Sequence, residues 1–144
     1  MDFSKLRHRI TFLKPVDDFT NSMGESVVAW QVYNPAKHTA AKIYLQSDDN
    51  GNIVFADGAP PAGELKPFEV WACATPQTGR EYTESQKIRN ETTYNVITRY
   101  FDGISADMKI LFRSRIFDIV SVLNIDSRNE QLKIIATERD SNGS

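Results

Sequence analysis

The sequence predicts a mainly β protein, a small antiparallel β-barrel of about six to seven strands with one short helix and a long inserted hairpin loop. Hydrophobic residues recur chiefly with a period of two, which is typical of strands. Turn-forming residues separate short runs that are rich in Val, Ile, Thr, Tyr and Phe. The 144 residues fit one domain, and a chain of this length can bury a sufficient core without disulfides.

Seven runs carry the strand pattern. In order, they are Arg7–Leu13, Val27–Tyr33, Phe68–Thr75, Glu91–Phe101, Met108–Phe112, Arg115–Leu123 and Glu130–Glu138. Alternation along a strand places every second side chain on the same face. The residues expected to share a face are His8, Ile10 and Phe12 in the first run, Val28, Trp30 and Val32 in the second, Phe117, Ile119 and Leu123 in the sixth, and Leu132, Ile134 and Ala136 in the last.

One segment, 79–88, departs from the strand pattern and predicts the short helix. Thr78 fits the N-cap position, and Glu81 follows three residues later, as in a capping box. Arg80 and Glu84 lie one helical turn apart and can pair. The stripe of apolar residues is thin, so we expect this helix to lie on the barrel.

Two stretches are expected to be loops within a single domain that spans 1–139. Residues 16–26 are polar and contain a glycine, which fits a hairpin connection. Residues 34–66 form a 33-residue insertion between the second and third strands. Its strand-like runs 41–46 and 52–56 flank an Asn-Gly pair, a strong hairpin signal. A Pro/Gly-rich run that is not expected to pack follows, so a hairpin projecting on a flexible stem is predicted. The last residues, 140–144, are expected to be a flexible tail.

The composition points away from catalysis, cofactors and metals. Lys and Arg number 17 against 19 Asp and Glu, and this balance argues against a nucleic-acid clamp. Cys73 is the single cysteine, and His8 and His38 have no neighbours at metal-ligand spacing. Nucleotide-binding and hydrolase motifs are missing. The longest apolar run, Val70–Ala74, is too short for a membrane span, so a soluble intracellular chain is expected. We therefore expect a protein that is not an enzyme.

Seven short motifs occur in a distinctive order. They are Leu6–Thr11 (LRHRIT), Gly24–Trp30, Val70–Ala72 followed by Gly79–Tyr82 (GREY), Thr98–Tyr100, Gly103–Met108, Arg115–Ile119 (RIFDI) and Leu132–Ile135. Together they resemble the phage head–tail joining family, the small head-closure (stopper or adaptor) proteins of tailed bacteriophages and prophages. Two departures stand out. Ser114 occupies a position that is commonly Gly in the family, and the insertion interrupts a connection that is direct in many relatives.

The resemblance implies a virion structural protein. Such proteins dock under the portal as a ring after DNA packaging, retain the packaged DNA, offer the attachment face for the tail and open for ejection. The implied partners are a portal or adaptor protein above, a tail protein below, and further copies of the chain, typically a dodecamer in the virion and a monomer in solution. Packaged DNA passes through the channel, and no membrane is involved. The implied location is the head–tail interface of the virion, with the host cytoplasm before assembly.

The resemblance also implies two sets of site residues. A loop between the second and third strands points into the channel of relatives that act as stoppers, so the candidate channel or gating loop comprises Asp48, Asp49, Asn50, Gly51 and Asp57. Its carboxylates would repel DNA phosphates, whereas an external loop that contacts the tail or solvent is the alternative. The candidate subunit-contact residues are Arg7, Arg9, Arg80, Glu81, Tyr82, Arg115 and Asp118. Solvated strand edges and a DNA-facing role are the alternatives for the basic residues among them. The same alternatives hold for Arg113, which flanks a turn together with Arg115.

Two other functions stay open at this point. A tail-completion or tail-terminator subunit is also a small β protein that forms rings. A free nucleic-acid-binding barrel of the OB type could use Trp30, Tyr44, Phe55 and Trp71 as stacking platforms. Salt-dependent DNA affinity of the isolated monomer would favour the OB-type barrel.

Overall fold

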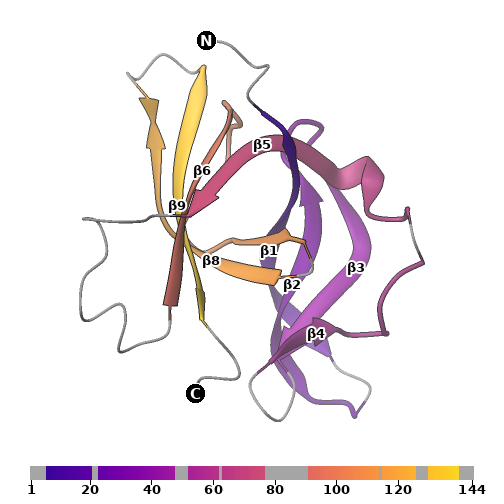
Figure 1. Ribbon diagram of the computed structural model, residues 1–144. Helices are drawn as coiled ribbons and strands as arrows, with labels where there is room; N and C mark the ends of the chain where they lie inside the picture. Colours follow the sequence, from indigo (N-terminus) through magenta and orange to yellow (C-terminus); the bar gives the residue numbers. More distant parts are fainter. Residues whose placement is uncertain are drawn as a thin grey trace.

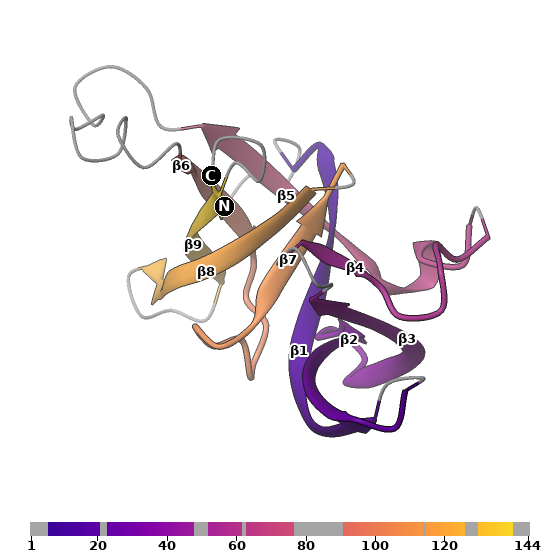
Figure 2. The same cartoon turned by 90° about the horizontal axis from the view of Figure 1, so that it is seen from below.

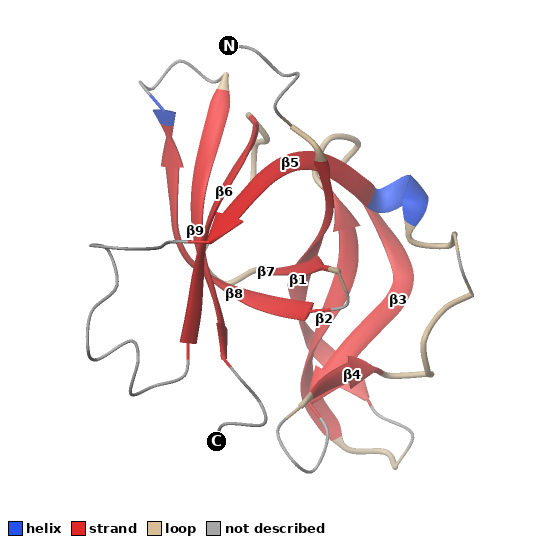
Figure 3. Ribbon diagram, viewed as in Figure 1, coloured by secondary structure: helices blue, strands red, loops and turns tan. Residues whose placement is uncertain are grey.

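The computed structural model describes residues 6–20, 23–47, 52–61, 63–76, 91–113, 115–125 and 130–139 (Figure 1). These residues form one nine-stranded sheet and a short 3-10 turn, η2, at Lys66–Phe68. The strands are β1 (His8–Thr20), β2 (Ser26–Asn34), β3 (Thr39–Ser47), β4 (Ile53–Phe55), β5 (Glu69–Pro76), β6 (Glu91–Arg99), β7 (Lys109–Phe112), β8 (Arg115–Asn124) and β9 (Gln131–Arg139). The predicted mainly β architecture is confirmed, as the colouring by secondary structure in Figure 3 shows.

Six strands close into an antiparallel barrel in the order β1, β5, β6, β9, β8, β7. The pairing of β7 with residues 11–13 of β1 completes the circle. Strands β2, β3 and β4 continue the sheet from β1 and lie outside the barrel. Figure 2 shows this extension curling beside the barrel strands.

Strand β1 belongs to both parts of the sheet. Thr11 is aligned with Glu69 of β5 and with Leu111 of β7, so these two strands flank β1 on opposite edges. Phe12 is also aligned with β7, and its other neighbour is Tyr33 of β2. Strand β2 therefore takes over from β5 along the same edge of β1. One long strand thus holds the barrel and the extension together.

Both faces of β1 and β7 are buried where these two strands meet. Ile10, Phe12 and Ile110 point into the barrel and are at most 1% exposed. Leu13 and Leu111 point the other way, into a second core under the extension. Leu13 is 0% exposed there, which a strand with one solvent face could not achieve. The extension therefore covers apolar surface on the outside of the barrel.

The barrel core confirms most of the predicted inward faces. Its predicted members are Ile10, Phe12, Phe117, Ile119, Leu132, Ile134 and Ala136. The predicted inward position of Leu123 is wrong, because this side chain is 54% exposed. A register shift between Ile119 and Ser121 inserts an extra residue in β8, so Val122 packs inward in its place. In β2, Trp30 and Val32 lie on the same side and pack in the second core, as predicted. The prediction that Val28 joins them is wrong, because Val28 is exposed.

The predicted loop at 16–26 is wrong over most of its length. Strand β1 continues to Thr20, and β2 already begins at Ser26. The two strands stay paired, with one extra residue in β1 between Val16 and Phe19. This bulge disrupts the alternation on which the sequence pattern depends, so a polar strand resembles a loop.

The hairpin predicted within the insertion is confirmed, since β3 and β4 pair in antiparallel register with Leu45 opposite Phe55. The prediction that the insertion projects without packing is wrong for the described residues. Ala41 and Leu45 are buried, and Leu65 and Phe68 pack against them although they adjoin the Pro/Gly-rich run. Leu13 and Leu111 on the outer side of the barrel supply the apolar partner that local composition cannot reveal.

One buried side chain ties the two ends of the insertion. Asn34 is 4% exposed and donates from Nδ2 to the carbonyl oxygen of Pro67 at 2.9 Å. Its Oδ1 accepts from the backbone N–H groups of Ala36 and Lys37 at 2.9 and 3.3 Å. The side-chain amide of Asn34 therefore holds two segments together, namely the turn after β2 and the segment that leads into β5.

The predicted helix at 79–88, the residue Ser114 and the tail 140–144 lie outside the described residues. Within the described ranges, no helix has the length and apolarity needed to cross a membrane.

Replacing Asn34 by Ala tests the closure of the insertion. We expect Asn34→Ala to lower the free energy of unfolding by about 1–3 kcal/mol, because buried backbone groups lose their partners. Urea titration of the full chain measures this change. Lys37→Ala is the matched control, since its side chain is exposed and its backbone N–H is kept. Equal stability of the two variants would contradict the assigned role of Asn34.

Candidate assembly surfaces

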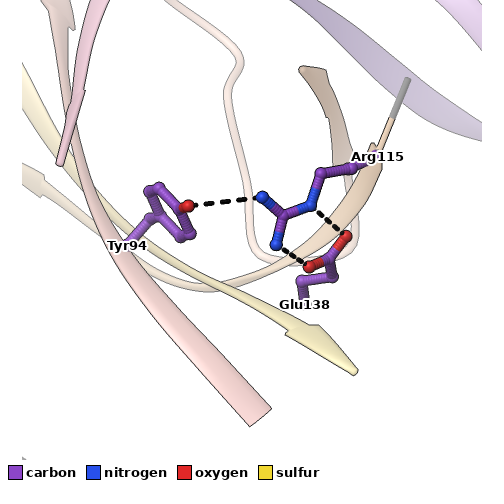
Figure 4. Close-up of polar contacts among 3 residues, drawn as sticks. All are labelled: Tyr94, Arg115 and Glu138. Atoms are coloured by element: carbon purple, nitrogen blue, oxygen red, sulfur yellow. Dashed lines mark hydrogen bonds and ion pairs between the residues drawn. The ribbon is translucent and has the colours of Figure 1, made fainter. Parts of the chain in front are cut away.

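Arg115 lies at the start of β8 and is held within its own barrel (Figure 4). Its Nε donates to Oε2 of Glu138 on β9 at 2.7 Å, and its second terminal nitrogen pairs with Oε1. The remaining nitrogen donates to the hydroxyl of Tyr94 on β6 at 3.4 Å. The hydrogen bond with Glu138 raises the pKa of Arg115 above its ordinary value. This clamp links three neighbouring strands, so an intramolecular role accounts for a residue that the sequence singled out for subunit contact.

Asp118 also has a partner inside the chain. It lies opposite Lys109 across the β7–β8 pair, and the two side chains form an ion pair. The Lys109 ammonium group also sits 4.5 Å from the ring centre of Trp30 in the extension. Asp118 stays 60% exposed, so this pair contributes at most about 1 kcal/mol and leaves its carboxylate accessible.

A basic cluster forms around the first half of β1. Arg9 places its guanidinium 3.9 Å from the ring centre of Trp71 on β5, and that indole is 47% exposed. Arg7 is exposed beside it, and Arg113 joins from the turn after β7. Of these residues, the sequence predicted Arg7 and Arg9 as contact residues. The sequence singled out Arg113 only as a basic residue that flanks a turn, and its proximity to Arg9 follows from the pairing of β7 with β1.

His8 lies within this cluster and is neutral in the folded chain. Its Nδ1 accepts a hydrogen bond from the backbone N–H of Ala74 at 3.0 Å, and its ring packs edge-on against Phe112. Burial lowers the pKa of His8, and the positive charges of Arg113 and Arg7 lower it further. Protonation of this ring would break the bond with Ala74 and add a charge among cations.

An open groove lies between the extension and the outside of the barrel. Its volume is about 310 Å³. The apolar lining consists of Leu45, Ile53, Phe55, Leu65, Leu111 and Ile116. Thr11, Arg9, Arg113 and Glu69 complete the lining, so two cations and one carboxylate border an apolar floor. No local sequence pattern predicts this groove, because its walls come from strands that are far apart in the chain.

Asp57 is the member of the predicted gating loop that lies within the described residues. Asp57 is exposed in the turn that follows β4, in which the N–H of Gly58 donates to the carbonyl oxygen of Phe55 at 3.3 Å. Asp48, Asp49, Asn50 and Gly51 lie outside the described residues, as do Arg80, Glu81 and Tyr82. Their predicted roles stay untested.

In the described part of the chain, no group of three or more His, Cys, Asp or Glu side chains could hold a metal ion. His38 bonds the hydroxyl of Tyr33 at 3.0 Å, and Cys73 is half-buried in β5. The polar side chains described above pair across strands or border the groove. The molecule is therefore a small closed barrel with charged side chains on its outer surface.

A sequence-family model described as phage head completion protein matches residues 1–139, and the chain belongs to this family. The family gives it a structural role in the virion, in the head–tail region. No curated protein matches the chain at a significant level.

Two solved structures share the fold. One, from the virion of a native gene transfer agent particle, is 16% identical with a TM-score of 0.52, covering 94% of this chain and 96% of that chain. The other is the solution structure of protein SF1141 from Shigella flexneri 2a. It is 18% identical with a TM-score of 0.51, covering 96% of each chain.

The lowered pKa of His8 predicts a loss of stability on mild acidification. Well above the ordinary pKa of about 6.5, the ring is neutral in both the folded and the unfolded chain, so the shift has no effect. As the pH falls below that value, the unfolded chain binds a proton first, and the free energy of unfolding decreases. Urea titrations between about pH 7.5 and 5.5, which span the ordinary pKa of histidine by about one unit on each side, measure this slope. His8→Asn, which keeps an acceptor, should flatten it, and an unchanged slope would contradict the assignment.

The Arg115 clamp predicts a coupling that is measurable in the isolated chain. Arg115→Met and Glu138→Gln should each lower the free energy of unfolding, and their double-mutant cycle should give about 0.5–1 kcal/mol of coupling. Additive effects of the two substitutions would show that the pair contributes nothing, which would return Arg115 to the set of subunit-contact candidates.

Proposed function

We propose that the chain is a head-closure subunit that docks as a ring beneath the portal, retains packaged DNA and provides the face to which the tail attaches. The observation that carries this proposal is the family match over 1–139, which spans the barrel and the insertion together. The partners are a portal or adaptor protein above and a tail protein below. The task is mechanical, so the proposal requires no catalytic group.

The surface chemistry supports a role in assembly. In a ring, each subunit presents two different faces to its neighbours, and many weak contacts add up around the circle. Arg115 has partners within its own barrel, whereas Arg9 and Arg113 form no ion pair with a described carboxylate. We therefore assign subunit contact to the basic cluster of Arg7, Arg9 and Arg113, with Arg115 as a structural residue.

The aromatic residues favour this proposal over an OB-type nucleic-acid barrel. Trp30 and Phe55 pack in or against the second core, and Tyr44 lies against Phe19 with ring centres 5.0 Å apart. Trp71 is the exposed member, and the guanidinium of Arg9 lies over its ring. Stacking platforms need open ring faces in a row. These four rings are engaged in the fold instead.

We further propose that the tip of the insertion, Asp48–Gly51 together with Asp57, faces the channel and acts as a gate. Carboxylates there would keep DNA phosphates from adhering while the channel is open. Because Ala41 and Leu45 belong to the second core, removing the whole insertion would unfold its cover. The gate is therefore best tested at the tip alone.

The assembly role predicts a specific arrested particle. Phage that lack this chain should accumulate DNA-filled heads and separate, complete tails, and added purified chain should restore joining. Electron microscopy of lysates distinguishes the alternatives. Defective or overlong tails beside normal heads would instead indicate a tail-completion protein, and normal virions would contradict any head–tail role.

Shortening the tip tests the gate. We expect replacement of 48–51 by Asn-Gly to give particles that still join tails but lose packaged DNA, measured as the fraction of empty particles. Removal of 140–144 is the control, because that tail is predicted to be dispensable. Heads that hold DNA normally with the shortened tip would show that the loop is external.

A further inference from the structure

We propose that the groove between the extension and the barrel binds an extended segment of a different virion subunit, in which an apolar side chain lies next to an Asp or Glu. This inference rests on the proposed function for the source of the segment, which is the portal, adaptor or tail subunit that meets the chain. It adds the site and the chemistry that join the two proteins. All the residues that line the groove lie within the described ranges.

The floor of the groove is apolar and is built from both layers of the molecule. Leu45, Ile53 and Phe55 belong to the extension, whereas Leu111 and Ile116 belong to the barrel strands β7 and β8. The open volume of about 310 Å³ lies at the lower end of the range of ligand sites, roughly 300–1,000 Å³. An apolar side chain that enters the groove loses its contact with water and covers this floor.

Arg9 and Arg113 border the groove, and each guanidinium lies over an aromatic ring. The Arg9 group is 3.9 Å from the ring centre of Trp71, and the Arg113 group is 4.8 Å from the ring centre of Phe112. A guanidinium that lies over a ring keeps N–H groups at its edge to donate to a carboxylate. Neither arginine forms an ion pair with a described carboxylate. The fold therefore holds two cations in position for a carboxylate that arrives from outside.

The charge at the border suits single carboxylates better than nucleic acid. Two arginines and Glu69 border the groove, so they sum to one net positive charge. Duplex DNA presents a dense row of phosphates and offers no side chain that could fill the apolar floor. A peptide segment with an acidic residue beside an apolar one complements both the cations and the floor.

Strand β4 offers a place for the backbone of such a segment. It is the terminal strand of the sheet, since within the described chain it pairs with β3 alone. Ile53 and Phe55 of this strand line the groove, so the open edge of β4 lies at that wall. An extended segment can pair with an open sheet edge through main-chain hydrogen bonds while alternate side chains enter pockets. The groove therefore suits an extended segment.

A second copy of the chain is a poorer source of this segment. Met23 is the most exposed of the large apolar side chains, but it already interacts within its own chain. The other exposed large apolar side chains all lie on strands that are paired in the sheet, namely Val28, Val54, Trp71, Val120 and Leu123. Among the described residues, none of these side chains thus lies on an unpaired extended segment. We therefore assign the occupant to a different protein, and repetition around a ring would strengthen a contact that is weak in each subunit.

Methyl NMR of the full chain tests the site with synthetic peptides. The probe is the capped hexapeptide Asp-Glu-Leu-Phe-Asp-Glu, and the control Asn-Gln-Leu-Phe-Asn-Gln keeps the apolar pair without the carboxylates. We expect the probe to shift the resonances of Ile53, Leu111 and Ile116 with a dissociation constant of about 1 mM or lower. The control peptide should bind at least about tenfold more weakly. Val120 and Leu123 do not line the groove, so their resonances should stay in place.

Substitution of single arginines separates a built site from general attraction between charges. Arg113→Gly and Arg9→Gln should each weaken binding of the probe by about tenfold. Glycine suits the φ of 53° at position 113, and unchanged resonances of Ile110 and Ile134 in the barrel core would report an intact fold. Arg7→Gln is the matched control, because Arg7 is exposed nearby but does not line the groove. It should change binding by less than about twofold.

Several results would overturn the inference. They are equal binding of the two peptides, an equal loss with Arg7→Gln, or no shift at the groove methyl groups. Shifts of the same methyl groups with chain concentration alone would assign the groove to a second copy, and shifts with duplex DNA would assign it to nucleic acid. The readout is separate from tail joining. A chain that restores joining but binds no peptide would remove this site and leave the proposed function intact.

Discussion

The burial of both faces of β1 is the constraint on which the rest of the structure depends. Phe12 fills the barrel and Leu13, the next residue, fills the second core, and both are 0% exposed. Neighbouring residues can both be buried only if each face of the strand is covered. One face of β1 points into the barrel, which the pairing of β7 with β1 closes. The other face points outward, and the extension that begins with β2 must cover it. The insertion is therefore an integral layer of the fold, and Asn34 secures its base.

This arrangement connects the fold with the surfaces available for assembly. The same β7–β1 pairing that closes the barrel brings Arg113 toward Arg9 and creates the groove between barrel and extension. Arg115, by contrast, is paired with Glu138 inside the chain. In the proposed ring, Arg9 and Arg113 are therefore available to a neighbouring subunit, whereas Arg115 stabilises the monomer.

The local pattern of hydrophobic residues was sufficient to predict the strands and the core of the barrel. It was insufficient to predict how the extension packs on the outside of the barrel. Alternation identified Ile134 and Ala136 on β9 because that strand is regular along its length. It failed at Leu123 and at residues 16–20, where single-residue bulges change which face a side chain occupies. The packing of Leu65 could not be foreseen, since its partners lie on the outer surface of a barrel that sequence pattern treats as solvent-facing. The groove depends on strand closure, which leaves no local signal, and so does the approach of Arg113 to Arg9. Arg7 and Arg9 stood out because they alternate on one strand.

Hydrogen exchange of individual backbone amides tests most directly the claim that β1 makes the barrel and the extension one cooperative unit. Under native conditions, buried amides at Leu13 in β1, Val32 in β2 and Leu45 in β3 should open with the same free energy as Ile134 in the barrel strand β9, and should respond equally to added urea. Exchange at Val32 and Leu45 through an independent, low-energy opening, while Ile134 stays protected, would show that the extension is a separable appendage and would contradict the account.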